Sequence, residues 1–223
     1  MYNSVQEFVG GPPGEARVRG FLHVPETSSG DGLVLTHGAG SNCESPLLVT
    51  LSNAFCDLGF MVLRCDLPYR QLRPHGPPPR GSADRDRHGL RNAVITLRER
   101  VAGRVFLGGH SYGGRQASML AAAEPGLADA LLLLSYPLHP PQRPNEVRTA
   151  HFPKLTTPSL FIHGARDGFA TAEELTDALR LVPAGTRLLS IPGAGHELMT
   201  KRNSDAFAAL VTGAFLSFSA ATG

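Results

Sequence analysis

The feature that most constrains the fold is a regular alternation of short apolar runs with longer segments of helical spacing. Six apolar runs each end in a polar or glycine-rich turn, as buried strands do: 32–38, 60–66, 104–110, 130–137, 159–164 and 187–193. The intervening segments carry apolar residues at helical spacing: 46–59, 86–101, 114–124 and 171–182. We therefore predict an α/β fold, with a mainly parallel twisted sheet flanked by helices on both faces.

The two ends of the chain extend this pattern. Residues 4–10 and 16–25 have the composition of two further strands joined by a Gly/Pro turn. At the other end, residues 204–218 predict a final helix that begins at Ser204 as its cap. With 223 residues in total, the chain is expected to form one domain over residues 1–223.

Composition narrows the function classes. The net charge of +2 gives no reason to expect binding to nucleic acid or to an acidic membrane. The densest apolar run, ALLLL, is too short to cross a bilayer, and the first residues do not resemble a signal peptide. The three scattered cysteines, Cys43, Cys56 and Cys65, are typical of free thiols in a reducing compartment. We therefore expect a cytoplasmic protein.

The stretch GGHSYGG, residues 108–114, has the spacing of a nucleophile elbow. Gly109 and Gly113 flank Ser111 at the positions of a G-x-S-x-G motif. A strand-like run precedes the motif, and an alanine-rich helical segment follows it. This context lifts a serine hydroxyl clear of the sheet edge. Ser111 is therefore the predicted nucleophile.

A serine nucleophile needs a base, and the base needs an acid that orients it. Asp167 lies in the turn after the next-to-last predicted strand, and His196 lies in the turn after the last one. Both follow Ser111 in the chain order that this motif requires. Among the alternatives, Glu197 is in the wrong order, Glu146 lies too far beyond its strand, and His163 belongs to a strand end. We predict Ser111, Asp167 and His196 as the catalytic residues.

The reaction also needs two donors for an oxyanion. The residue after the nucleophile, Tyr112, is expected to supply one backbone N–H. The turn HGAGSN, residues 37–42, is expected to supply the other from Ala39, with Gly38 and Gly40 providing the bend. Cys43, beside this turn, lacks an elbow and a neighbouring base, so we reject it as the nucleophile.

An arginine- and proline-rich stretch, residues 64–91, separates the second and third of the six runs. Its composition favours a solvated loop shaped by proline. Alternatively, Arg70, Arg73 or Arg80 overhangs the site and favours a substrate that bears a carboxylate or phosphate. Arg73 and Arg80, together with Gly38 and Gly40, are the candidate substrate-binding residues.

The motifs HGAGSN, GGHSYGGRQAS, GARDGF and GAGHEL resemble the signatures of the α/β-hydrolase superfamily. More narrowly, they are similar to its small dienelactone-hydrolase-like members. Within these, they resemble the KANL/testis-expressed-like branch, whose elbow carries a basic residue where His110 stands. The resemblance implies an α/β-hydrolase fold, the Ser111–Asp167–His196 triad, and neither a metal nor an organic cofactor. Dienelactone hydrolases proper use cysteine at the position of Ser111, so their substrate does not carry over.

Between the fourth and fifth of the six runs lie only about twenty proline-rich residues, too few for a large lid domain. We therefore expect an open site and a small-molecule acyl substrate, with a carboxylic ester or thioester hydrolysed through an acyl-enzyme. A peptidase or amidase with the same triad is one alternative, and a non-catalytic interaction module on a hydrolase scaffold is another. The expected assembly is a monomer or homodimer.

Overall fold

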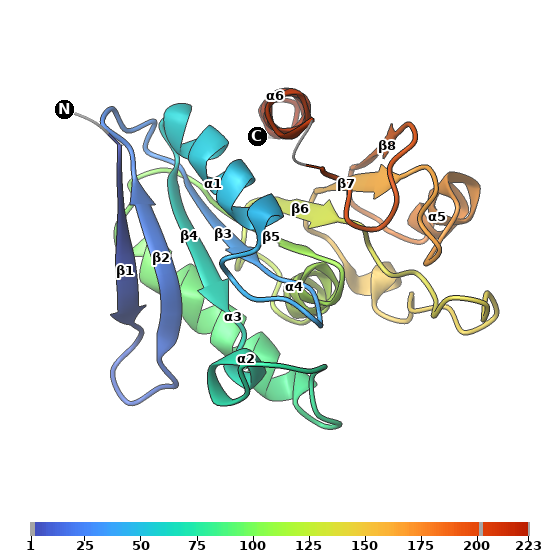
Figure 1. Ribbon diagram of the computed structural model, residues 1–223, viewed down its shortest axis with the longest axis horizontal. Helices are drawn as coiled ribbons and strands as arrows, with labels where there is room; N and C mark the ends of the chain where they lie inside the picture. Colours follow the sequence, from blue (N-terminus) through green and yellow to red (C-terminus); the bar gives the residue numbers. More distant parts are fainter. Residues whose placement is uncertain (1–2, 201–202, 223) are drawn as a thin grey trace.

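One eight-stranded sheet runs through the centre of the computed structural model, which describes residues 3–200 and 203–222 (Figure 1). The spatial order of its strands is β1-β2-β4-β3-β5-β6-β7-β8. Strand β2 is antiparallel to both of its neighbours, and all the other neighbouring pairs are parallel. The bounds of the strands are β1 Ser4–Gly10, β2 Val18–Val24, β3 Gly32–Thr36, β4 Met61–Asp66, β5 Val105–His110, β6 Leu131–Leu134, β7 Ser159–Gly164 and β8 Thr186–Ile191. The predicted mainly parallel sheet is confirmed.

Helices cover both faces of the sheet, as predicted. Helices α1 (Pro46–Asp57) and α6 (Ser204–Ala220) lie together on one face. Helices α3 (Ala83–Arg98), α4 (Tyr112–Ala123) and α5 (Ala172–Leu179) pack on the other (Figure 1). A short helix, α2 (Pro68–Leu72), and a 3-10 turn, η1 (Phe152–Lys154), complete the described elements.

The side chains of the central strands pack into two separate hydrophobic cores, one on each face of the sheet. In β5, Val105 and Leu107 pack toward α3 and α4, whereas Phe106 points to the opposite face. There its ring meets that of Phe215 from α6 edge to face, with centroids 5.0 Å apart. The side chains of a strand alternate between the two faces, so a strand covered on both sides has to be apolar throughout. This is why the central strands appear in the sequence as unbroken apolar runs.

The ends of two elements differ from the predictions. Strand β6 ends at Leu134 instead of continuing to residue 137, because Ser135 takes a positive φ of 47° and turns the chain. Ser204 is not the cap of the last helix but its first residue, and Asn203 holds the cap position without a side-chain cap bond. The Asn203 side chain instead accepts the N–H of Thr200 at 2.7 Å.

The stretch 64–91 is more ordered than the predicted loop. It contains α2, and α3 begins at Ala83, three residues before the predicted start. Pro68 opens α2 at a position where its missing N–H costs nothing. Two acidic residues of the first turn, Asp84 and Asp86, suit the start of α3. The prediction of a loop is therefore right only for the middle of the stretch.

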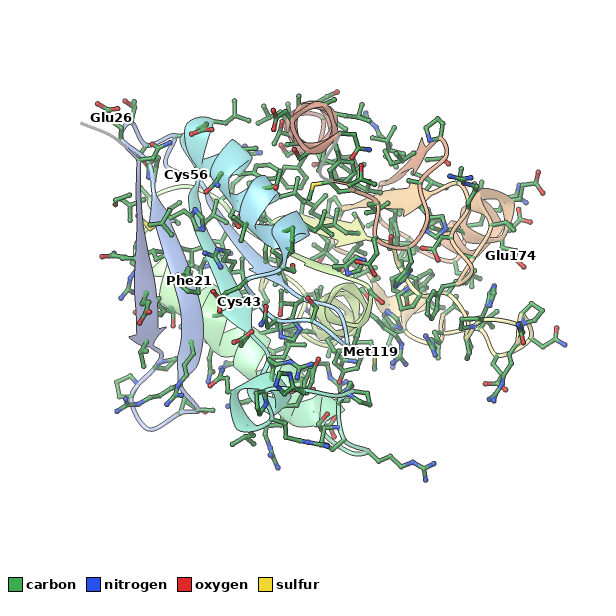
Figure 2. The ribbon with its side chains drawn as sticks, viewed as in Figure 1. Phe21, Glu26, Cys43, Cys56, Met119 and Glu174 are labelled. Atoms are coloured by element: carbon green, nitrogen blue, oxygen red, sulfur yellow. The ribbon has the colours of Figure 1, made fainter. Side chains whose placement is uncertain are left out.

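The cysteines are free, as predicted, and all three are buried; Figure 2 shows Cys43 just before α1 and Cys56 near its end. Burial raises the pKa of the Cys43 thiol to about 12, which leaves it in the unreactive protonated form. Among the described residues, no helix is both long enough and apolar enough to cross a membrane.

Candidate active site

Ser111 occupies a sharp turn between β5 and α4. Its φ of 51° is unusual for a residue with a side chain. Its backbone N–H bonds to the carbonyl of Leu134 at the end of β6, at 2.8 Å, and its carbonyl accepts the N–H of Arg115. The turn is thereby fixed from both sides, as a strained backbone at a functional position has to be. The structure thus gives Ser111 the geometry of the predicted elbow.

The flanking glycines are required by close packing. A Cβ at Gly109 would lie 2.8 Å from the backbone of Gly113, so β5 and α4 approach within backbone contact. A Cβ at Gly113 would lie 2.5 Å from the carbonyl oxygen of His37 in the turn after β3. The two glycines therefore let the elbow touch the turn that was predicted to supply an oxyanion donor.

Gly113→Ala is expected to lower the free energy of unfolding by about 1–3 kcal/mol, because the methyl group forces this contact apart. Chemical denaturation measures the change. Gly213→Ala is the matched control, since Gly213 lies within α6 and its Cβ would meet nothing within 4 Å. The control should be neutral or slightly stabilising. Equal unfolding midpoints for Gly113→Ala and the wild type would contradict this packing argument.

The three predicted catalytic side chains form one hydrogen-bonded chain. His196 Nε2 lies 2.8 Å from Ser111 Oγ, and His196 Nδ1 lies 2.8 Å from Asp167 Oδ2. Because a carboxylate only accepts, Nδ1 carries the proton and Nε2 is free to accept the serine proton. Asp167 follows β7 and His196 follows β8, so both reach Ser111 from the carboxyl ends of parallel strands.

Asp167 is held as a carboxylate. Burial alone would raise the pKa of its carboxyl group, but the hydrogen bonds from His196 and from the N–H of Phe169 outweigh that effect. The pKa of Asp167 therefore lies below its ordinary value, and the group stays ionised at neutral pH. Behind it, His163 bonds through Nε2 to the carbonyl of Ala170 at 2.9 Å. This contact gives His163 a structural role and fixes the loop that carries Asp167.

His196 is positioned through its backbone as well as its ring. Its carbonyl oxygen accepts two hydrogen bonds, from Ser135 Oγ at 2.7 Å and from His110 Nε2 at 2.9 Å. Burial lowers the pKa of His110, so its ring is neutral and Nε2 is its donor. The ring of Phe169 packs against the imidazole of His196 with centroids 4.3 Å apart. Sequence reasoning missed both residues: Ser135 belongs to no motif, and Phe169, the last residue of GARDGF, was not singled out there.

A pocket of about 480 Å³ opens over Ser111. The turn after β3 forms one wall, and the residues around the triad form the other: Gly38, Ala39, Gly40 and Ser41 face His110, Ser111, Phe169, His196 and Glu197. Three residues predicted to bind an oxyanion or the substrate, Gly38, Ala39 and Gly40, are thus beside the nucleophile. Tyr112 is the first residue of α4, where backbone N–H groups have no partner within the helix.

The other two candidate substrate-binding residues lie elsewhere. Arg73 and Arg80 line a separate hollow of about 130 Å³, together with Tyr69 and Arg85. The structure does not bring them into the pocket over Ser111, and their steering of an anionic substrate stays a prediction. Glu146 is paired with Arg143 on the surface, at 3.4 Å, and does not reach His196.

Comparison with known proteins identifies the family of the fold. Residues 30–218 match the family described as the alpha/beta hydrolase domain. Among solved structures, a dienelactone hydrolase from Anabaena variabilis is 25% identical, with a TM-score of 0.73 over 96% of this chain and 98% of the relative.

Two further structures share the fold at lower identity. An esterase of Pyrococcus furiosus is 14% identical, with a TM-score of 0.76 over 99% of this chain and 92% of its own. A serine hydrolase without a lid from Xanthomonas campestris is 17% identical, with a TM-score of 0.66 over 98% and 96%. In the present chain, too, the segment between β6 and β7 contains η1 and no lid domain. The chain belongs to the α/β-hydrolase domain family.

Proposed function

We propose that the protein is a serine hydrolase that cleaves a carboxylic ester or thioester of a small acyl group. The observation that carries the proposal is the unbroken chain from Asp167 through His196 to Ser111, with 2.8 Å at each step, at the floor of an open pocket. A dienelactone hydrolase and an esterase among the structural relatives support the same class of reaction.

The proposed reaction begins with attack by Ser111. Its Oγ forms a bond to the acyl carbon, the carbonyl π pair moves onto the oxygen, and the serine proton passes to His196 Nε2. The backbone N–H groups of Ala39 and Tyr112 stabilise the resulting oxyanion. His196 then returns the proton to the departing alkoxide or thiolate. Water then attacks the acyl carbon of the acyl-enzyme and gives a proton to His196. His196 returns this proton to Ser111 Oγ as the acid is released.

The pocket favours small acyl groups without negative charge. Glu197 is the one charged side chain among the residues that line it, and its carboxylate repels an anionic substrate. With no lid, little apolar surface is available to cover a long acyl chain. We also propose that this chain is related to the KANL/testis-expressed-like branch of the superfamily, because its elbow reads GGHSYGGRQAS.

A panel of p-nitrophenyl esters of increasing acyl length, run beside the matching p-nitroanilides, tests the proposal. We expect the highest kcat/KM for short acyl esters and slower turnover of the amides, whose leaving group is poorer. A fluorophosphonate probe should label the wild-type protein at Ser111 stoichiometrically. Faster turnover of the amides would assign the protein to the amidases, and an unlabelled, inactive protein would point to a non-catalytic role.

A further inference from the structure

The carbonyls of Gly38 and Ala39, in the turn after β3, are both hydrogen-bonded. In a trans peptide the C=O and the N–H point in opposite directions, and the described residues contain no cis bond. The carbonyl of Gly38 therefore sets the direction of the Ala39 N–H, and the carbonyl of Ala39 sets that of the Gly40 N–H. Whatever binds these two carbonyls decides where the two N–H groups point.

The carbonyl of Gly38 lies 2.8 Å from His37 Nδ1 and accepts the N–H of Ser41 at 3.1 Å, whereas two consecutive residues of α2 bind the carbonyl of Ala39. The Tyr69 hydroxyl lies 2.8 Å from the carbonyl oxygen of Ala39 and 3.3 Å from that of Gly38. Arg70 donates from Nη2 to Ala39 at 3.1 Å and from Nε to the carbonyl of Ser41 at 2.7 Å. Both side chains are buried, with Tyr69 2% and Arg70 5% exposed, so water does not compete for these bonds.

The positive charge of Arg70 is surrounded by backbone carbonyl oxygens. Besides Ala39 and Ser41, it donates to the carbonyls of Arg73 at 2.9 Å and Gly76 at 2.8 Å. Its guanidinium thus donates to four backbone carbonyls. A buried cation without a carboxylate is costly unless several acceptors surround it. Arg70 therefore fastens the turn after β3 to the proline-rich segment beyond α2.

Tyr69 is connected to the second predicted donor through one carboxylate. Asp86, which is fully buried, accepts the N–H of Tyr69 at 3.0 Å through Oδ1. Through Oδ2 it accepts the hydroxyl of Tyr112 at 2.8 Å. The rings of Tyr69 and Tyr112 also meet edge to face, with centroids 5.9 Å apart. Asp86 thus joins α2 to the start of α4, where the N–H of Tyr112 is expected to act.

We propose that Tyr69 and Arg70 are positioning residues that set the oxyanion hole. Tyr69 and Arg70 hold the carbonyl of Ala39, and with it the N–H of Gly40. Together with His37 and the N–H of Ser41, Tyr69 also holds the carbonyl of Gly38, so that the N–H of the proposed donor Ala39 faces the pocket over Ser111. The inference rests on the proposed function, because an oxyanion forms only if Ser111 attacks a carbonyl. Neither side chain touches the substrate, and neither lines the pocket.

Tyr69→Phe and Arg70→Lys test the inference. Tyr69→Phe removes only a hydroxyl, and Arg70→Lys keeps the charge but loses the planar fork that reaches several carbonyls. We expect kcat to fall about 10- to 100-fold with KM unchanged, somewhat less than the loss of a whole oxyanion donor. Matched controls are Tyr136→Phe and Arg148→Lys, which remove bonds to the carbonyls of Arg148 and Pro137 outside the pocket. The controls should keep wild-type kcat.

Inhibition by a trifluoromethyl ketone separates positioning from a general loss of structure. The ketone forms a tetrahedral adduct with Ser111 whose oxyanion needs the same N–H groups. Its Ki should rise in the variants by the factor by which kcat/KM falls, while binding of the carboxylate product stays unchanged. A purely structural role would weaken both ligands alike and lower Tm.

The outcomes distinguish the two proposals. If the wild-type protein hydrolyses esters and is labelled at Ser111, while Tyr69→Phe keeps its kcat within about two-fold, the positioning role of Tyr69 and Arg70 alone is overturned. A wild-type protein that neither hydrolyses esters nor reacts with the probe would overturn the proposed function, and with it this inference.

Discussion

Ser111→Ala is expected to lower kcat for p-nitrophenyl acetate by about 10⁶-fold, the scale of loss when a serine nucleophile is removed. The alanine has no oxygen to form the acyl-enzyme, and the 2.8 Å contact with His196 Nε2 disappears. KM is expected to change little, since the rest of the pocket remains. Steady-state kinetics together with intact-mass measurement after fluorophosphonate treatment give the two readouts.

Ser52→Ala is the matched control for this loss. Ser52 is a fully buried serine of α1, remote from the pocket, whose hydroxyl has no hydrogen-bond partner among the described residues. It should retain wild-type turnover and labelling. Residual activity of Ser111→Ala above about a tenth of wild type would mean that another group is the nucleophile.

Asp167→Asn is expected to lower kcat by about 10⁴-fold. An amide at this position offers His196 a donor, which favours the tautomer whose proton is on Nε2 and leaves no lone pair for the Ser111 proton. The imidazolium formed during attack also loses its buried counter-charge. Because Asp167 does not line the pocket, KM should stay near its wild-type value.

Asp129→Asn provides the corresponding control. The Asp129 carboxylate also accepts a backbone N–H, that of Val105 at 2.7 Å, but at the start of β5, away from the catalytic end of the strands. It should keep wild-type kcat, even if Tm falls slightly. Comparable kcat values for Asp167→Asn and Asp129→Asn would show that Asp167 does not orient the base.

The parts of the fold that sequence reasoning predicted well are set by local patterns. The central strands are apolar throughout because both faces of the sheet are covered, and this composition is visible in the run of residues 130–134 as in the others. The elbow is equally local, since Gly109, Ser111 and Gly113 are separated by single residues. The loop positions of Asp167 and His196 follow once the strands are assigned.

What the sequence did not predict depends on contacts between distant segments. Arg70 looks like a solvated residue of a proline-rich stretch, yet it is buried because carbonyls of residues 39 and 41, about thirty positions earlier, surround it. Ser135, where β6 ends early on a positive φ, bonds through its hydroxyl to the carbonyl of His196, some sixty positions later. No periodicity or capping signal encodes such partners, so the role of these residues needed the three-dimensional arrangement.

The single carboxylate of Asp86 has a consequence for how the chain can diverge in evolution. Its oxygens bind groups of Tyr69, Ser82 and Tyr112, which belong to three separate stretches of sequence. Losing the Tyr112 hydroxyl leaves one buried acceptor less satisfied, at a cost of about 1–3 kcal/mol, whereas replacing Asp86 removes the acceptor of all three groups at once. Position 86 is therefore expected to vary less among relatives of this chain than position 112.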